Sequence, residues 1–247
     1  EERKKTKGKN LQDKTVFQRF LVMFMGVGFN FVFAFLILLF IGLIFGAPST
    51  EPVINDVTEG YPAEQAGIEK GDEVLRINGH KVSYLEDISL YLTVEDLSKT
   101  VTFEVKKSNG ELATYHVNPE KVKDEEGNDK YAVGIALKAD INKGIGDSIV
   151  YAFNEECAMF KQMFVVIANL FTGGVHLNQL SGPVGIYSIV GQMSEQGISA
   201  LLYLTALLSI NVGVINLLPF PAFDGGRILF LIIEKIKGSP VDPKIEN

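Results

Sequence analysis

The sequence of 247 residues carries a formal net charge of −7 and has a pI near 5.1. This acidity excludes a general nucleic-acid binder, and the single cysteine, Cys157, excludes an internal disulfide. The hydrophobic fraction of 47% is ordinary for a globular protein, but residues 20–46 contain no charge, whereas residues 50–148 are polar and charged throughout. We therefore expect a membrane protein with a soluble insert, and no signal peptide in the charged first residues.

The first apolar segment, residues 20–46, exceeds the roughly 20 apolar residues that span a bilayer core, so it predicts a transmembrane helix. The segment before it, residues 1–19, is rich in Lys and Arg and predicts a cytoplasmic flank. A second apolar region, Ser199 to Phe220, predicts a second transmembrane helix and is also followed by basic residues. Together with the motif and the helix that follow, it makes up residues 199–238. The chain would thus leave the cytoplasm and return to it, with Ala47 to Gly197 outside.

The polar insert shows strand and turn signals over residues 50–138. Segments with strand character at Val74 to Ile77 and at Val101 to Val105 are followed by the turn signals Asn78-Gly79 and Asn109-Gly110. This pattern resembles a PDZ domain. The resemblance implies a groove that captures an extended peptide as an added strand.

The expected groove has a helical wall and a binding loop. Residues 84–98 place leucine and isoleucine at roughly helical spacing, which predicts the wall. The charged segment Lys121 to Lys130 predicts a solvent-exposed loop. The segment after it resembles the strand and loop that bind peptide backbone in rearranged PDZ domains, with Val133, Gly134 and Ile135 as the groove residues.

A linker with interfacial helices is expected over residues 148–198. The apolar stretch from Phe160 to Phe171 is too short to span a bilayer, which suits an element at the membrane interface or beside a cavity. The break Ser181-Gly182-Pro183-Val-Gly follows it. From the residues alone, a loop and an amphipathic surface helix without a catalytic part is the alternative interpretation.

The most informative residue is Asp224, an acid between two apolar runs. It lies in the segment Asn216-Leu-Leu-Pro219-Phe-Pro221-Ala-Phe-Asp224-Gly225-Gly226-Arg227. An ionisable group at membrane depth is costly unless it is paired, binds a metal or faces water. Two prolines break the incoming helix and two glycines let the backbone approach a metal closely, which suits a metal ligand. From the residues alone, it is equally good to interpret Asp224 as the cap of the next helix, paired with Arg227.

The pattern Asn-x-x-Pro-x-Pro-x-x-Asp-Gly closely resembles the second metal-binding motif of the site-2 protease family, the RseP-type intramembrane zinc metalloproteases of peptidase family M50. Ser181-Gly182-Pro183 resembles a further signature of that family. The resemblance implies that Asp224 is the third protein ligand of a zinc ion. It also implies two histidine ligands and a general-base glutamate from a His-Glu-x-x-His helix, a motif absent from these 247 residues. We therefore expect part of such an enzyme, inactive alone and truncated over residues 239–247.

Within the motif, Asn216 is the candidate for a hydrogen bond to the substrate backbone or to the developing oxyanion. Asn211 is expected to make an interhelical hydrogen bond. The remaining motif residues are expected to shape the backbone: Pro219, Pro221, Gly225, Gly226, Ser181, Gly182 and Pro183.

No other acid or histidine in the chain has a neighbouring ligand pattern. Glu155, Glu156 and Glu234 are expected to be solvated or interfacial. The histidines have no partner at i+4 and are expected on the surface or in loops; they are His80, His116 and His176.

The expected fold class is an α-helical membrane protein with an inserted extracytoplasmic α+β domain of PDZ type. The resemblance implies a multi-pass protein of the bacterial plasma membrane. It implies cleavage within transmembrane segments of single-pass proteins, such as anti-sigma factors or signal-peptide remnants, with the lipid bilayer as the other partner. The alternative is a catalytically inactive PDZ-containing membrane scaffold, and a weaker one is a transporter subunit with a broken helix.

Overall fold

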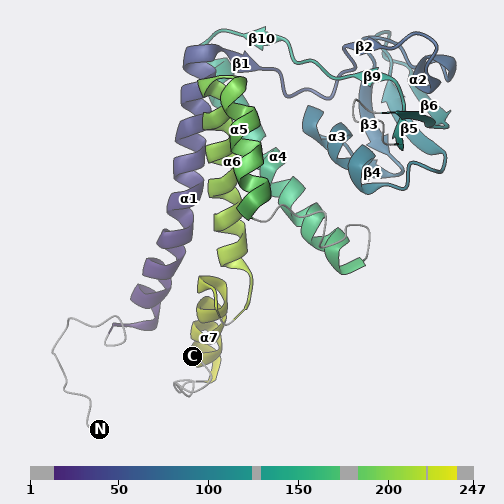
Figure 1. Cartoon of the computed structure of the whole chain (residues 1–247). Coiled ribbons are helices and arrows are strands. Elements are labelled where there is room, and N and C mark those ends of the chain that lie inside the picture. The colour runs from purple at the N-terminus through teal and green to yellow at the C-terminus, as the bar shows by residue number, and fades with distance from the viewer. Residues whose placement is uncertain (1–13, 124–128, 173–182, 221, 238–247) are drawn as a thin grey trace. The chain divides into compact units, whose positions relative to one another are not determined.

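The computed structural model describes residues 14–123, 129–172, 183–220 and 222–237 (Figure 1). The chain divides into two compact units, one of residues 1–37 with 202–247 and one of residues 38–201. The helices are α1 (Val16–Phe45), α2 (Pro62–Gln65), α3 (Leu85–Val94), α4 (Ile145–Thr172), α5 (Pro183–Glu195), α6 (Ile198–Leu217) and α7 (Asp224–Lys237). The strands are β1 (Ala47–Pro48), β2 (Asp56–Val57), β3 (Glu73–Ile77), β4 (His80–Lys81), β5 (Val101–Lys106), β6 (Leu112–Val117), β7 (Glu120–Lys123), β8 (Asp129–Ala132), β9 (Ile135–Ala136) and β10 (Ile141–Asn142).

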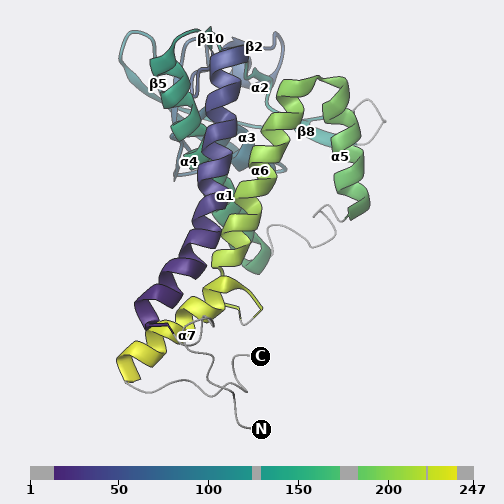
Figure 2. The same ribbon diagram turned by 90° about the vertical axis from the view of Figure 1, so that its left-hand side faces the viewer.

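Helices α1 and α6 are both long and apolar enough to cross a membrane. Helix α1 begins at Val16, before the expected start at Phe20, because Thr15 and Gln18 form a capping box. The two helices lie side by side in both views (Figures 1 and 2). The Ser209 hydroxyl donates a hydrogen bond of 2.9 Å to the carbonyl of Asn30 across this contact.

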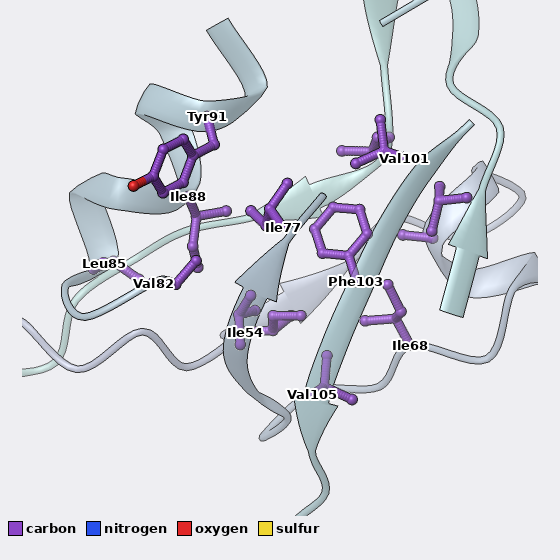
Figure 3. Packing of buried hydrophobic residues seen from close by; sticks show 14 residues of the cluster. Ile54, Ile68, Ile77, Val82, Leu85, Ile88, Tyr91, Val101, Phe103 and Val105 are labelled. Atoms are coloured by element: carbon purple, nitrogen blue, oxygen red, sulfur yellow. The ribbon is translucent and has the colours of Figure 1, made fainter. Parts of the chain in front are cut away.

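The core of the second unit is a four-stranded antiparallel sheet of order β4-β3-β5-β6. Alternate residues of β5 point inward, so Val101, Phe103 and Val105 are fully buried (Figure 3). Strands β3 and β4 are joined by the expected turn, with positive φ at Asn78 and Gly79. Helix α3 covers this core with Ile88, as the apolar spacing predicted.

The segment from Lys121 to Lys130 is not simply a loop, contrary to the expectation. Its described residues form a hairpin of β7 and β8, with an ion pair of 2.6 Å between Lys121 and Asp129. The hairpin was missed because both strands are almost entirely exposed, so they lack the alternation of apolar and polar residues that marks a half-buried strand. After it, Gly134 adopts a φ of +81° and Ile135 pairs with Val57 in β2.

Helix α4 is also longer than the expected apolar helix from Phe160 to Phe171, since it begins at Ile145. Its buried residues recur at helical spacing and include Tyr151, Ala152, Glu155, Ala158 and Met159. This face packs in part against α3. The apolar stretch predicted too short a helix because the first half of α4 is amphipathic and so lacks a continuous apolar run.

Candidate functional site

Asp224 lies where the polypeptide reverses after an apolar helix. Helix α6 ends at Leu217, and a turn that includes Pro219 leads to α7, which begins at Asp224. A Cβ atom on Gly225 would overlap the carbonyl oxygens of Leu217 and Leu218, so a glycine is needed there. The start of α7 is therefore packed directly on the end of α6. The expected approach of this backbone to a metal stays a prediction.

The structure assigns Asp224 a helical position and not the capping position. The carbonyl of Phe223 accepts hydrogen bonds from the amides of Gly226 and Arg227, at 3.1 and 3.4 Å, so Phe223 takes the capping position. Among the ion pairs of the described residues, none joins Asp224 to Arg227. The interpretation of Asp224 as a helix cap paired with Arg227 is thus wrong in both parts. Its half-buried carboxylate lies at the positive end of the α7 dipole.

The other motif residues are distributed around this turn. Asn216 is half-buried in the last turn of α6, next to Leu217. Asn211 is also half-buried, but it lies about 140° away around the helix, so the two amides face different directions. Gly226 is buried and Pro219 is exposed. Pro221, Ser181, Gly182 and His176 lie outside the described residues, and Pro183 begins α5.

The donor chemistry at this turn fits one ligand of a zinc site. A carboxylate oxygen is among the usual protein ligands of zinc, together with histidine nitrogen and cysteine sulfur. In residues 14–123, 129–172, 183–220 and 222–237, no three His, Cys, Asp or Glu side chains are grouped so that they could hold a metal ion. Of these residues, only Asp224 combines a carboxylate with the expected motif, so the remaining ligands would have to come from elsewhere.

The predicted peptide loop lies at the edge of a groove in the second unit. The cavity has a volume of about 530 Å³ and is lined by Val133, Gly134 and Ile135. The lining also includes Leu92 of α3 and residues of the β7–β8 hairpin, among them Lys123 and Lys130. The expected loop and the expected helix thus line one cavity, and the two lysines were not predicted there. Peptide binding by this loop stays a prediction.

The family model described as Peptidase family M50 matches residues 1–247. The chain belongs to peptidase family M50. It is 39% identical over 233 residues to "Regulator of sigma-W protease RasP" of Bacillus subtilis (strain 168), covering 94% of this chain and 54% of that protein. It is 36% identical over 238 residues to "Zinc metalloprotease RasP" of Bacillus licheniformis, covering 96% and 56%. The same description belongs to a relative from Shouchella clausii, 38% identical over 240 residues, covering 93% and 54%. This M50 chain therefore spans about half the length of the curated relatives that it matches.

The M50 chain also contains a buried pair of glutamate side chains that the sequence did not predict. Glu155 of α4 is only 2% exposed, so it is not solvated, which was one of the two environments expected for it. It faces Glu86 of α3, one of whose carboxylate oxygens is buried without a hydrogen-bond partner in the described part of the chain. Burial, and then the charge of Glu155, raise the pKa of Glu86 to about 8. The helical spacing of the buried residues in α4 was the signal that could have found this contact.

A neighbouring ion pair links the same two helices. Asp87 of α3 is fully buried and accepts hydrogen bonds of 2.7 Å from the ammonium of Lys161 and from the amide of Ser83. Lys161 in turn lies 5.3 Å from the centre of the Tyr91 ring. The α3–α4 contact in this M50 chain thus contains a hydrogen-bonded charge pair, in which only Oδ2 of Asp87 has partners among the described residues. Beside it lies a carboxyl pair that favours one bound proton.

Proposed function

We propose that this chain is the second part of an intramembrane zinc metalloprotease that cleaves transmembrane segments of single-pass membrane proteins. The observation that carries the proposal is the position of Asp224. Its carboxylate lies at the turn after an apolar helix of spanning length, on a helix start that Gly225 packs against the end of α6. A half-buried acid at such a place is expected to bind a metal or to face water.

In this proposal Asp224 supplies the third protein ligand of the zinc ion. The two histidine ligands and the general-base glutamate come from a His-Glu-x-x-His helix in a segment outside these 247 residues. A zinc ion bound by three protein ligands lowers the pKa of a bound water to roughly 7 and so provides the nucleophile for peptide hydrolysis. Asn216, half-buried one residue before the end of α6, would hydrogen-bond the unwound substrate or the developing oxyanion.

The topology that we propose follows the charge distribution. Helices α1 and α6 cross the bacterial plasma membrane, with the basic residues before α1 and at the end of α7 on the cytoplasmic side. The α+β domain, residues 50–138, then lies outside the cytoplasm as a PDZ-like unit. The Bacillus subtilis relative is described as a regulator of sigma-W protease, which supports an anti-sigma factor as the substrate class.

Metal analysis of the protein with its upstream segment tests this proposal. We expect about one zinc ion per chain, together with cleavage of a single-pass membrane substrate that a chelator removes and added zinc restores. Residues 1–247 alone should hold less zinc, because they offer one ligand. A complete protein that neither binds zinc nor cleaves would instead support the inactive PDZ-containing scaffold.

We further propose that the groove of the PDZ-like unit binds a free peptide carboxylate at Val133 to Ile135, with Lys123 and Lys130 adding favourable charge. Gly134→Ala should weaken the binding of a fluorescent peptide with an apolar C-terminus about tenfold. The reason is that Gly134 has a positive φ, and an added Cβ atom would overlap the Cβ and Cγ atoms of Tyr61.

Gly110→Ala is the matched control for this groove variant. Gly110 also has a positive φ, of +86°, but its Cβ atom would meet nothing within 4 Å. The Gly110→Ala variant should therefore have the same backbone strain but keep its affinity for the peptide. Fluorescence anisotropy with free and amidated peptides measures both effects, and equal affinities for the two peptides would argue against carboxylate recognition.

A further inference from the structure

Helix α7 is held on two sides within its unit. At its start, Gly225 packs against the carbonyl groups of Leu217 and Leu218. Near its end, the Glu234 carboxylate accepts a hydrogen bond of 2.6 Å from the guanidinium of Arg19, in the first turn of α1. Gly225 and Glu234 are about two and a half helical turns apart, so they lie on opposite faces of α7. Contacts on opposite faces restrain the helix against both tilting and rolling.

The ion pair at the second contact is largely shielded from water. The side chains of Arg19 and Glu234 are 18% and 17% exposed. A mostly apolar groove of about 500 Å³ lies between the same two helix ends, lined by Thr15, Val16, Phe17, Phe20, Leu231, Ile232 and Lys235. In such surroundings the attraction between charges is strong and directional, while the desolvation cost cancels much of its contribution to stability. A pair of this kind is better suited to fixing a geometry than to stabilising the fold.

We propose that Arg19 and Glu234 are positioning residues that fix α7 and thereby aim the carboxylate of Asp224. This inference rests on the proposed function, in which Asp224 is a zinc ligand. Glu234 lies roughly 15 Å along the helix from Asp224, so it acts through the rigid helix and not by contact. Metal ligands must be held within roughly 0.5 Å and 10–20° of their productive geometry. A helix that is fixed only at Gly225 could roll out of that range.

Zinc affinity of the complete protein tests the inference. Metal-free protein with its upstream segment is titrated with zinc alone, comparing the native chain with Glu234→Gln, Arg19→Gln and the charge-exchanged double variant R19E/E234R. We expect each single variant to bind zinc about 10- to 100-fold more weakly, as is typical for groups that orient a metal ligand. The double variant should recover at least part of the affinity. Hydrogen exchange of the α7 amides in the metal-free protein should rise in the single variants.

The control is Lys237→Gln, which removes an exposed charge from the last turn of α7 and should leave zinc affinity unchanged. A purely structural role would lower the unfolding temperature of the single variants but leave the zinc affinity of the folded protein intact, and that result overturns the inference. If Asp224→Asn itself binds zinc like the native chain, the proposed function fails. If only Asp224→Asn loses zinc, the function stands and the positioning role fails.

Discussion

Asp224→Asn should reduce substrate cleavage by the complete protein more than about a hundredfold. Loss of a group that merely orients a ligand costs 10- to 100-fold, so loss of the ligand itself should cost more. Asparagine has the same shape and keeps the first turn of α7, so the unfolding temperature should change little. Cleavage of a single-pass membrane substrate in detergent or in vesicles measures the activity, and metal analysis should show the accompanying loss of zinc.

The matched control for this variant is Asp147→Asn. Asp147 is an exposed acid in the first turn of α4, so its replacement also removes a negative charge from the positive end of a helix dipole. That change should cost at most about 1 kcal/mol of stability and leave cleavage intact. If Asp224→Asn behaved like Asp147→Asn, the carboxylate of Asp224 would have only this electrostatic role, and the zinc-ligand proposal would be wrong.

Glu86→Gln should stabilise the protein near pH 8 and remove much of the pH dependence of its stability. The pKa of Glu86 is raised from 4.5 to about 8 by burial and by the charge of Glu155. Between these values the folded protein binds more protons than the unfolded chain, so stability falls as pH rises, by at most about 1.4 kcal/mol per pH unit. The native protein therefore loses stability between pH 4.5 and pH 8, on the order of 4 kcal/mol in total.

In Glu86→Gln the glutamine amide can donate a hydrogen bond to Glu155 without binding a proton from solvent. The contribution of this position to the pH dependence of stability is thereby removed. Thermal unfolding of the detergent-solubilised protein from pH 5 to pH 9 measures the difference. Burial also raises the pKa of Glu156, to about 7, so a weaker slope of the same sign should remain. Glu59→Gln, at an exposed position, should keep the native profile. A flat native profile, or a variant that is less stable at pH 8, would contradict the carboxyl pair.

Much of the fold could be predicted because the signals were local. The charge-free run from Phe20 and the second run from Ser199 predicted α1 and α6, since length and apolarity decide whether a helix can span a bilayer. The Asn78-Gly79 pair predicted the turn that joins β3 and β4, because few other residue pairs accept two positive φ angles. The exposed β7–β8 hairpin was missed, since its pairing leaves no apolar pattern in the sequence.

The candidate site likewise has features that the sequence predicted and features that it could not predict. The residues around Asp224 predicted a helix break, and α6 does end before Pro219. The packing of Gly225 on the end of α6 was not predicted, because it depends on where the chain folds back. The sequence could not decide whether Asp224 caps α7, because capping depends on which carbonyl accepts the first helical hydrogen bonds. In the structure that acceptor is Phe223.

The sequence by itself determined the family, the two apolar helices, the α+β insert and the acid at the helix break, because each follows from composition or from residues close in the chain. Only the tertiary structure decided which distant charges meet. Arg19 with Glu234 and Glu86 with Glu155 are far apart in sequence, and each alone resembles a solvated charge. Burial and pairing depend on how helices pack, which local residue patterns do not encode.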